Sequence, residues 1–449
     1  MNERKLQSNN KPELLQIELT YNCNLNCVFC YNPNRNKKID FQKLDKIIDR
    51  ISSFNIPQVY LIGGEPSLLG TEKLNEYIEK LSINSSVTIV TNGFITLKGI
   101  SNKLANIAVS LHGYDAKTHE RFNGVEGSYE HAIKSIQYYK SRGLNVRAVV
   151  VLSAMNYNII GKILLRCIEA GVDEIFIDRY EDGGIGASNS NKFDLKPTNN
   201  QFREGLTQII EVRNMELINK EKIGFGTAIP FCVDERLFSE SLLSSCGAGT
   251  DFCAVTPDGN LRICNQSKVV MGNILDENIE DIWRTQAIQE YRDLNWVDSP
   301  CKECRLLSEC IGGCRVDENC NKNFVIDYAI RDDNDEIMRK NQENINQGKL
   351  NPTYFIENFS PKKINDNDKY FVDRFTHINR TENQYFLVTQ FSSARIGRIE
   401  YQVIEQLINR KEFSFREICE CFFEYEEEGI ENLFNQLLFL NAIRKVEND

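Results

Sequence analysis

Residues 15–30 read LQIELTYNCNLNCVFC, and this stretch decides how the first half of the chain is interpreted. It begins with apolar and polar residues in alternation, which is typical of a β-strand. Three cysteines follow the expected strand directly in the spacing C-x3-C-x2-C, namely Cys23, Cys27 and Cys30. Three thiolates can bind three irons of a [4Fe–4S] cluster and leave the fourth iron open to another ligand. The alternative is a zinc knuckle, which needs a fourth ligand, and neither Cys nor His follows before His112.

Strand patterns and helical patterns alternate through the rest of the first half. Residues 41–51 repeat apolar side chains on one helical face after a possible N-cap at Asp40. Strands that alternate with helices predict parallel pairing and right-handed crossovers. Six such units predict an α/β fold, a partial (βα)6 barrel with its chemistry at the C-terminal ends of the strands. The six expected strands cover residues 15–20, 59–62, 87–91, 107–111, 145–152 and 174–178.

Composition and charge bound the class of protein. The chain has 449 residues, of which 41% are hydrophobic and 26% charged, as in ordinary globular proteins. Its net charge of −11 argues against tracking phosphates, so we expect no nucleic-acid partner. Residues 1–11 lack the apolar core of a secretory signal, and the apolar runs are too short to cross a bilayer. We therefore expect a cytoplasmic protein without a membrane partner, in which clustered cysteines bind metal rather than pair.

A second motif stands at the end of the second expected strand, where residues 63–66 read GGEP. A pair of glycines lets the backbone approach a ligand closely, and the carboxylate beside it can meet a cationic amino group. Together with the cysteine spacing and the aromatic Phe29, this turn closely resembles the radical S-adenosylmethionine (SAM) enzymes.

The resemblance implies a cofactor and a chemistry. SAM would chelate the open iron of the cluster held by Cys23, Cys27 and Cys30, and its reductive cleavage would give a 5′-deoxyadenosyl radical. That radical abstracts a hydrogen atom from the substrate. The GGE residues would hold the methionine amino group, and Ser110 and Arg121 the ribose or carboxylate. By position in the family pattern the candidate SAM contacts are Phe29, Gly63, Gly64, Glu65, Asn92, Ser110, Arg121 and Asn156. For the last four, a role as a turn or surface residue remains open.

Eight further cysteines lie between residues 246 and 320. A tight hairpin turn at 257–259 is expected to return Cys264 toward Cys246. The spacing closely resembles the SPASM extension found behind radical SAM domains, which carries two auxiliary clusters. The resemblance implies three [4Fe–4S] clusters in total. The first auxiliary cluster would be ligated by Cys246, Cys264, Cys314 and Cys253, and the second by Cys301, Cys304, Cys310 and Cys320. The alternative is a pair of zinc ribbons, which also use C-x2-C pairs.

Cys253 has a mechanistic consequence. If it ligates, both auxiliary clusters are closed and would act as electron conduits or acceptors. If it is free, the first auxiliary cluster has an open iron that could bind a substrate thiolate. We expect that Cys253 does ligate and that this cluster is closed. The remaining cysteines receive no ligand role. Cys167 is expected in the core, and Cys232 at the surface or in the core, with a position facing the active cavity as the alternative.

Domain boundaries follow from composition and pattern. A flexible break is expected over 183–191, followed by a helix over 198–217. Residues from about 385 to 446 faintly resemble the PqqD-like peptide-recognition domain, in which a leader peptide adds a strand to a three-stranded wing. A generic winged helix for oligomerisation or regulation is the alternative. The expected domains are a radical SAM partial barrel over 14–240, a SPASM domain over 241–325, a linker over 326–368 and a winged-helix/PqqD-like module over 369–449.

The sequence therefore predicts a radical SAM/SPASM maturase that acts on a precursor peptide or small protein. It would install a thioether, ether or carbon–carbon cross-link, or oxidise a side chain, in the maturation of ribosomally synthesised peptides (RiPPs). A reduced flavodoxin or ferredoxin-type protein would donate the electron. Formylglycine formation, as in sulfatase-maturing enzymes, is in doubt because Asn265 stands where that family has a catalytic Asp. The other rivals are a small-metabolite dehydrogenase or epimerase and a non-enzymatic iron–sulfur or zinc-binding protein.

Overall fold

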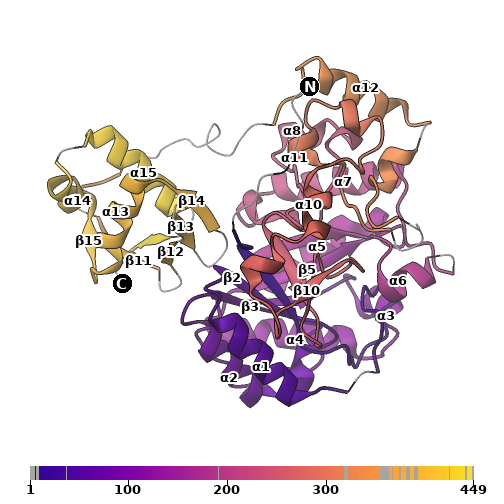
Figure 1. Ribbon diagram of the computed structural model, residues 1–449, viewed down its shortest axis with the longest axis horizontal. Helices are drawn as coiled ribbons and strands as arrows, with labels where there is room; N and C mark the ends of the chain where they lie inside the picture. The colour runs from indigo at the N-terminus through magenta and orange to yellow at the C-terminus, as the bar shows by residue number, and fades with distance from the viewer. Residues whose placement is uncertain are drawn as a thin grey trace.

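The computed structural model describes most of the chain (Figure 1). The described residues are 6, 10–36, 38–190, 192–317, 322–332, 334–352, 364–366, 368–373, 376–380, 385–388, 393–423, 425–439 and 442–446.

One ten-stranded sheet organises the larger part of the molecule, in the order β10-β9-β8-β1-β2-β3-β4-β5-β6-β7. From β1 to β7 every neighbouring pair is parallel, which confirms the α/β class with parallel pairing. The strands are β1 (Leu14–Glu18), β2 (Gln58–Ile62), β3 (Ser86–Thr91), β4 (Asn106–Ser110), β5 (Val146–Leu152), β6 (Glu174–Arg179), β7 (Ile223–Phe225), β8 (Phe252–Val255), β9 (Asn260–Arg262) and β10 (Val270–Asn273).

Helices join these strands and share one buried apolar core with them. In α1, Leu44, Ile47 and Ile48 are buried in this core, and the side chain of Asp40 caps the helix, as the sequence predicts. The helices of this part are α1 (Phe41–Ser52), α2 (Thr71–Leu81), α3 (Ala116–Asn123), α4 (Ser128–Ser141), α5 (Ile160–Glu169), α6 (Gly184–Asn189), α7 (Asn199–Asn214), α8 (Arg236–Ser239), α9 (Ile279–Ile282), α10 (Gln286–Arg292), α11 (Leu307–Cys310) and α12 (Glu336–Asn346).

The cysteine-bearing hairpin after β7 continues the same sheet. Strand β8 pairs in parallel with β1, so that Leu14 lies opposite Phe252, and β9 and β10 follow in antiparallel order. A buried ion pair of 2.5 Å between Glu18 of β1 and Arg262 of β9 fastens the hairpin. The strand that leads into the first cysteine loop is therefore bonded directly to the start of the second cysteine region.

The glycine-rich segment expected to be a flexible break is instead the short helix α6. Its backbone N–H groups donate to the first cysteine loop: Gly186 N lies 2.8 Å from Cys30 O, and Ile185 N lies 3.1 Å from Asn32 O. Gly184 has a φ of +53°, and a Cβ there would lie 1.9 Å from Tyr31 O. The glycines thus permit close packing on the cysteine loop rather than disorder.

The segment expected to be a linker also contains ordered structure. Helix α12 begins after Asp335, whose carboxylate accepts from Met338 N at 3.0 Å. Met338, Asn341 and Ile345 are buried against the body of the protein. Helix α12 therefore packs against the main body of the protein, whose apolar core includes Met338 and Ile345.

The C-terminal module has an apolar core of its own. Figure 1 shows it beside the body of the protein. Its described residues form two three-stranded antiparallel sheets, β15-β11-β16 and β12-β13-β14. Its elements are β11 (Lys369–Val372), β12 (His377–Arg380), β13 (Tyr385–Val388), β14 (Ser393–Ile396), α13 (Arg398–Ile408), β15 (Phe413–Ser414), α14 (Phe415–Cys421), α15 (Glu427–Phe439) and β16 (Ile443–Lys445).

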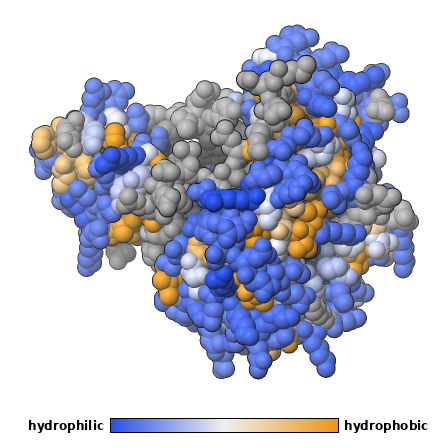
Figure 2. Space-filling model, viewed as in Figure 1, coloured by the Kyte–Doolittle hydropathy of each residue, from blue (hydrophilic) through white to orange (hydrophobic). Residues whose placement is uncertain are grey.

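The visible face of the molecule in Figure 2 is mostly hydrophilic, with small scattered apolar areas. Within the described residues, none of the helices combines the length and apolarity needed to span a bilayer.

Because α6 packs closely on the first cysteine loop, we expect the stability of the protein to fall when a side chain is added at Gly184. Gly184→Ala should lower the free energy of unfolding by roughly 1–3 kcal/mol, because the new Cβ collides with Tyr31 O at a positive φ. Gly224→Ala is the matched control, since no heavy atom lies within 4 Å of its Cβ position. Urea unfolding of the full chain measures both, and equal effects in the two variants would contradict the packing described for α6.

Candidate active site

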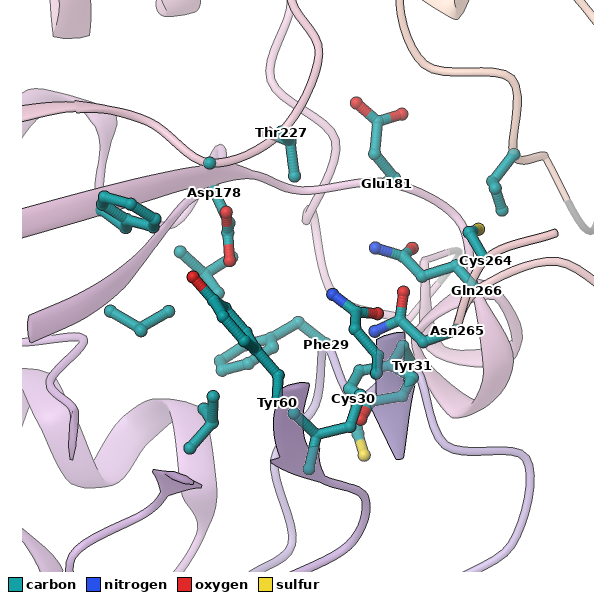
Figure 3. A pocket seen from close by; sticks show the side chains of 18 of the residues that line it. Phe29, Cys30, Tyr31, Tyr60, Asp178, Glu181, Thr227, Cys264, Asn265 and Gln266 are labelled. Carbon is teal, nitrogen blue, oxygen red and sulfur yellow. The ribbon is translucent and has the colours of Figure 1, made fainter. Parts of the chain in front are cut away.

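A cavity of about 460 Å³ is lined by residues along the parallel strands and beyond their C-terminal ends, and it brings both cysteine regions together. Figure 3 shows Cys30 and Tyr31 of the first loop near Asn265 and Gln266, which follow Cys264 of the second region. Among the residues that line this cavity are Cys23, Cys27, Phe29, Cys30, Gly63, Gly64, Glu65, Asn92, Ser110, Cys246, Cys264 and Cys314.

The first cysteine loop gathers its three thiols. Burial raises the pKa of Cys27, and the nearby thiols of Cys30 and Cys23 raise it further. Burial also raises the pKa of Cys23 to about 11. Arg35 lies beside the loop, where its guanidinium donates to the carbonyl oxygen of Cys27. Thiols that act on one another in partly buried surroundings are costly to ionise unless a cation compensates, so this loop fits a cluster-binding role.

The GGEP turn packs directly on that loop. Gly64 N donates to Thr20 O at 2.6 Å, and Glu65 N donates to Asn22 O at 2.8 Å. A Cβ at Gly63 would lie 2.4 Å from Thr20 O, and one at Gly64 would lie 2.1 Å from Asn22 O. Only glycine fits at both positions, and this half-buried backbone lines the cavity, which fits a SAM molecule beside the cluster.

Glu65 anchors the neighbouring turn. Its carboxylate accepts from Ser67 N at 2.9 Å, from the hydroxyl of Thr91 at 2.6 Å and from Asn92 N at 2.8 Å. Burial raises the pKa of Glu65, and these donors lower it again. The observed role of the carboxylate is to hold the end of β3, and a direct contact with the SAM amino group stays a prediction.

The other expected SAM contacts divide into two groups. Phe29, Asn92 and Ser110 line the cavity, and the ring of Phe29 packs edge-on against His112 at 4.7 Å. Arg121 is exposed on the outer side of α3. Asn156 is buried, where it accepts from Ser153 N and donates to Val151 O. Neither is among the cavity residues, so a SAM contact by these two has no structural support.

The expected ligands of the first auxiliary cluster are only partly brought together. Cys246, Cys264 and Cys314 line the cavity, and the thiol of Cys246 adds to burial in raising the pKa of both others. Cys253 is fully buried in β8 next to Phe252, which faces the cavity. Since successive strand side chains point to opposite faces, Cys253 points away from the three, which disfavours it as their fourth ligand.

Cys301, Cys304 and Cys310 lie together in the later loop, where burial and the other thiols raise the pKa of Cys301. Cys320 is outside the described residues. Among the residues that the structure describes, no three Cys, His, Asp or Glu side chains converge on the position of a single metal ion. The ligand assignments therefore rest on spacing, burial and mutual electrostatic contact.

The sequence interpretation missed a polar group at the other end of the cavity. Arg147 is buried against Glu174 at 2.7 Å and donates to the hydroxyl of Tyr60 at 3.1 Å. Figure 3 shows Tyr60 and Asp178 directed toward one another. Burial raises the pKa of Asp178 to about 6, and Arg147 opposes that shift. The signal in the sequence was a polar residue at an interior position of each strand.

Comparisons with known proteins agree with this geometry. A model of the radical SAM superfamily matches residues 17–164, and a model of the SPASM iron–sulfur cluster-binding domain matches residues 246–305. The chain therefore carries a radical SAM domain, which binds a [4Fe–4S] cluster and SAM, followed by a SPASM domain, which binds iron–sulfur clusters. It is an enzyme of the radical SAM/SPASM type.

Particular relatives are distant. PqqA peptide cyclase from Rhodopseudomonas palustris is 22% identical over 325 residues, covering 68% of this chain and 82% of that protein. An AdoMet-dependent heme synthase from Methanosarcina barkeri is 25% identical over 329 residues, covering 68% and 92%.

Solved structures show the shared fold. Streptococcus suis SuiB bound to its precursor peptide SuiA is similar with a TM-score of 0.57 at 20% identity, covering 72% of this chain and 76% of that one. Native anSMEcpe with bound AdoMet is similar with a TM-score of 0.55 at 18% identity, covering 75% and 98%.

The anchoring role of Glu65 yields a stability prediction. Glu65→Gln should lower the free energy of unfolding by roughly 1–3 kcal/mol, because an amide nitrogen cannot accept the hydrogen bonds that one carboxylate oxygen now receives. Glu72→Gln, at an exposed position of α2, should change it by less than about 0.5 kcal/mol. Urea unfolding of both full-length variants measures these free energies. A Glu65→Gln variant with the parent's free energy of unfolding would refute the anchoring role.

Proposed function

We propose that this enzyme modifies a peptide that enters the cavity between its two cysteine regions. The observation that carries the proposal is the single cavity lined at once by the C-x3-C-x2-C loop, the GGEP turn and three SPASM cysteines. A substrate there would lie between a site of hydrogen abstraction and a cluster at the opposite wall. The PqqA peptide cyclases and the peptide-bound SuiB structure support a peptide as substrate.

Three [4Fe–4S] clusters belong to the proposal. Cys23, Cys27 and Cys30 would hold the first, and the backbone of Gly63 and Gly64 would approach SAM. When bound, this pair supplies the 5′-deoxyadenosyl radical that takes a hydrogen atom from the substrate. The aromatic rings of Phe29, Phe176 and Phe252 line the same space and exclude water from it.

Forming a cross-link or oxidising a side chain also releases a proton, and Asp178 is the proposed acceptor. It lies on β6 at the cavity, beside Tyr60 and Arg147. A carboxyl group with a pKa near 6 is ionised at neutral pH and still basic enough to accept a proton. Asn265, at the position of the sulfatase-maturase base, lines the cavity and is hydrogen-bonded to Tyr31. Its proposed role is therefore to stabilise the cavity wall, and it does not act as a base.

Electron flow follows from the same placement. Cys246, Cys264 and Cys314 would hold a cluster at the cavity wall, and this cluster would accept the spare electron from the substrate. A reduced flavodoxin or ferredoxin-type protein in the cytoplasm would supply the electron for SAM cleavage. Both the donor and the compartment are part of the proposal.

The C-terminal module would recognise the leader of the precursor peptide. Strands β12 and β14 form the two edges of its antiparallel sheet, and Tyr401 of α13 stacks on Tyr385 of β13 at 4.2 Å between ring centres. An extended peptide can add a strand to such an edge and pack against the adjacent helix. The products would be thioether, ether or carbon–carbon cross-links or oxidised side chains, as in RiPP maturation.

The function is tested first by SAM cleavage. The anaerobically reconstituted chain should hold about twelve irons, and dithionite should make it release 5′-deoxyadenosine from SAM. Cys23→Ala should abolish the release, whereas Cys167→Ala, buried in α5 away from the cavity, should retain it. Zinc in place of iron, or cleavage that survives Cys23→Ala, would contradict the proposal.

The proton acceptor is tested by pH dependence. Product formation should fall as the pH drops through about 6, because protonated Asp178 cannot accept a proton. Asp178→Asn should lower product formation by roughly 10²–10⁴-fold and abolish this acidic limb, while SAM cleavage continues. Asp173→Asn, which breaks a half-buried 2.6 Å pair with Lys140, is the control and should keep the profile. Mass spectrometry of a co-expressed candidate peptide reports product, and an unchanged profile for Asp178→Asn would exclude this role.

The recognition role of the module is tested by deletion. Removing residues 369–449 leaves the core of the main body intact, since the module packs around a core of its own. The deletion should raise KM for the full precursor by tenfold or more and leave the KM for a leaderless core peptide unchanged (about 1.4 kcal/mol of binding per factor of ten). If the full precursor binds equally well without the module, leader recognition lies elsewhere.

A further inference from the structure

Cys232 lies against the loop that carries the expected ligands of the second auxiliary cluster. It belongs to the short 3-10 helix η4 (Phe231–Val233), which follows β7 and precedes the SPASM domain. The N–H of Phe231 donates to the sulfur of Cys310 at 3.4 Å, although the two residues are 79 positions apart. Pro230 packs on the same loop, since its Cγ lies 2.7 Å from the Cβ position of Gly313.

The sulfur of Cys232 shares its surroundings with three other sulfurs. Cys232, Cys301 and Cys310 are buried there, and Cys304 is half-buried. The sulfur of Cys310 accepts from the N–H of Phe231, the residue next to Cys232. The sulfur of Cys301 lies 3.7 Å from the Cβ position of Gly312, which precedes the Gly313 on which Pro230 packs. Two distant parts of the chain thus bring four thiols to one place, where they act on one another electrostatically.

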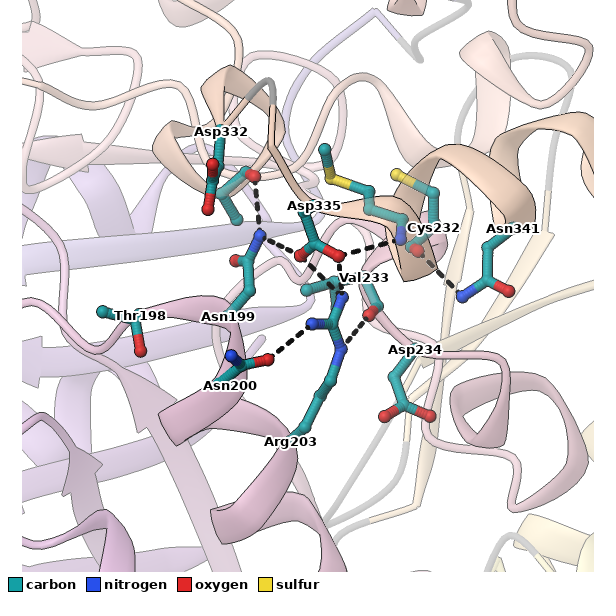
Figure 4. Close-up of polar contacts among 12 residues, drawn as sticks. Thr198, Asn199, Asn200, Arg203, Cys232, Val233, Asp234, Asp332, Asp335 and Asn341 are labelled. Carbon is teal, nitrogen blue, oxygen red and sulfur yellow. Dashed lines mark hydrogen bonds and ion pairs between the residues drawn. The ribbon is translucent and has the colours of Figure 1, made fainter.

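The backbone of Cys232 is fixed from two sides. Asn341 of α12 donates to Cys232 O at 3.1 Å, and Arg203 of α7 donates to Val233 O at 2.9 Å (Figure 4). Arg203 is itself held by both carboxylate oxygens of Asp335, at 2.7 and 2.9 Å. Gln342 directs its amide nitrogen at the sulfur of Cys232 from 3.7 Å. Fixed ligands with hydrogen-bond donors around their sulfurs are the features that tune metal and iron–sulfur centres.

We propose that Cys232 is the fourth thiolate of the second auxiliary cluster, together with Cys301, Cys304 and Cys310. This inference rests on the proposed iron–sulfur function and replaces Cys320 in the ligand set expected from the sequence. Four thiolates close the cluster, which then transfers electrons and does not bind substrate. The cluster would also tie the segment after β7 to the SPASM loop.

The test compares Cys232→Ala, Cys320→Ala and Cys167→Ala in the anaerobically reconstituted full chain. Iron and acid-labile sulfide are measured with the electron paramagnetic resonance (EPR) spectrum of the dithionite-reduced protein. Cys232→Ala should lose about four irons per chain, or keep them with an altered EPR signal. The control Cys167→Ala should match the parent, and Cys320→Ala should leave the EPR signal of this cluster unchanged. A Cys232→Ala variant with the iron content and spectrum of the parent overturns the proposal.

Cys232→Ser guards against a simple folding defect, because it keeps the size of the side chain. A serine oxygen in place of the sulfur should shift the EPR signal of one cluster, whereas a cysteine that merely packs in the core should leave the spectrum unchanged. Measurements on the parent chain distinguish a failure of this ligand assignment from a failure of the proposed function. A parent without iron refutes the proposed function, while an iron-loaded parent with unaffected Cys232 variants refutes only the ligand assignment.

Discussion

The contact between the GGEP turn and the first cysteine loop is the constraint on which the site depends. Two backbone hydrogen bonds, from Gly64 N to Thr20 O and from Glu65 N to Asn22 O, join the ends of β1 and β2 with no room for a side chain between them. Glu65 then fastens the end of β3. Three neighbouring strand ends are thereby fixed around the thiols, which is the rigid support that a metal centre and its ligand require.

A second set of buried contacts joins the barrel to the SPASM loop. Arg179 at the end of β6 is paired with Glu181 and with Asp327, and Asp327 accepts from Cys314 N at 2.9 Å. Breaking one partner of such a buried pair leaves an uncompensated charge, so the pairs hold their elements in one arrangement. The ion pair between Glu18 and Arg262 does the same at the other edge of the sheet. The cavity therefore has walls from both cysteine regions, and buried ion pairs join these walls.

The sequence predicts the strands and the cysteine loop because both signals are local. Alternation marks β1, short runs rich in β-branched residues mark β2 to β6, and the three cysteines follow one strand within eight residues of each other. Helix α6 escapes prediction because glycine disfavours helices, and only its contacts with residues 29–32 explain it. Asp178 and Tyr60 become visible only when parallel register brings β2 and β6 around one cavity. Arg121 was placed by family position alone, and the rotation of α3 turns it to the surface. Cys232 could not be joined to Cys310 without the tertiary fold.

The central claim is tested most directly by identifying the ligand of the unique iron in the cluster held by Cys23, Cys27 and Cys30. Electron–nuclear double resonance of the reduced chain with isotopically labelled SAM reports whether the methionine nitrogen and carboxylate are bound to that iron. Coupling from both labels is the predicted result, because the described loop supplies three thiolates beside a glycine cradle. A spectrum without such coupling, in which a protein side chain fills the position, would contradict radical initiation by this enzyme.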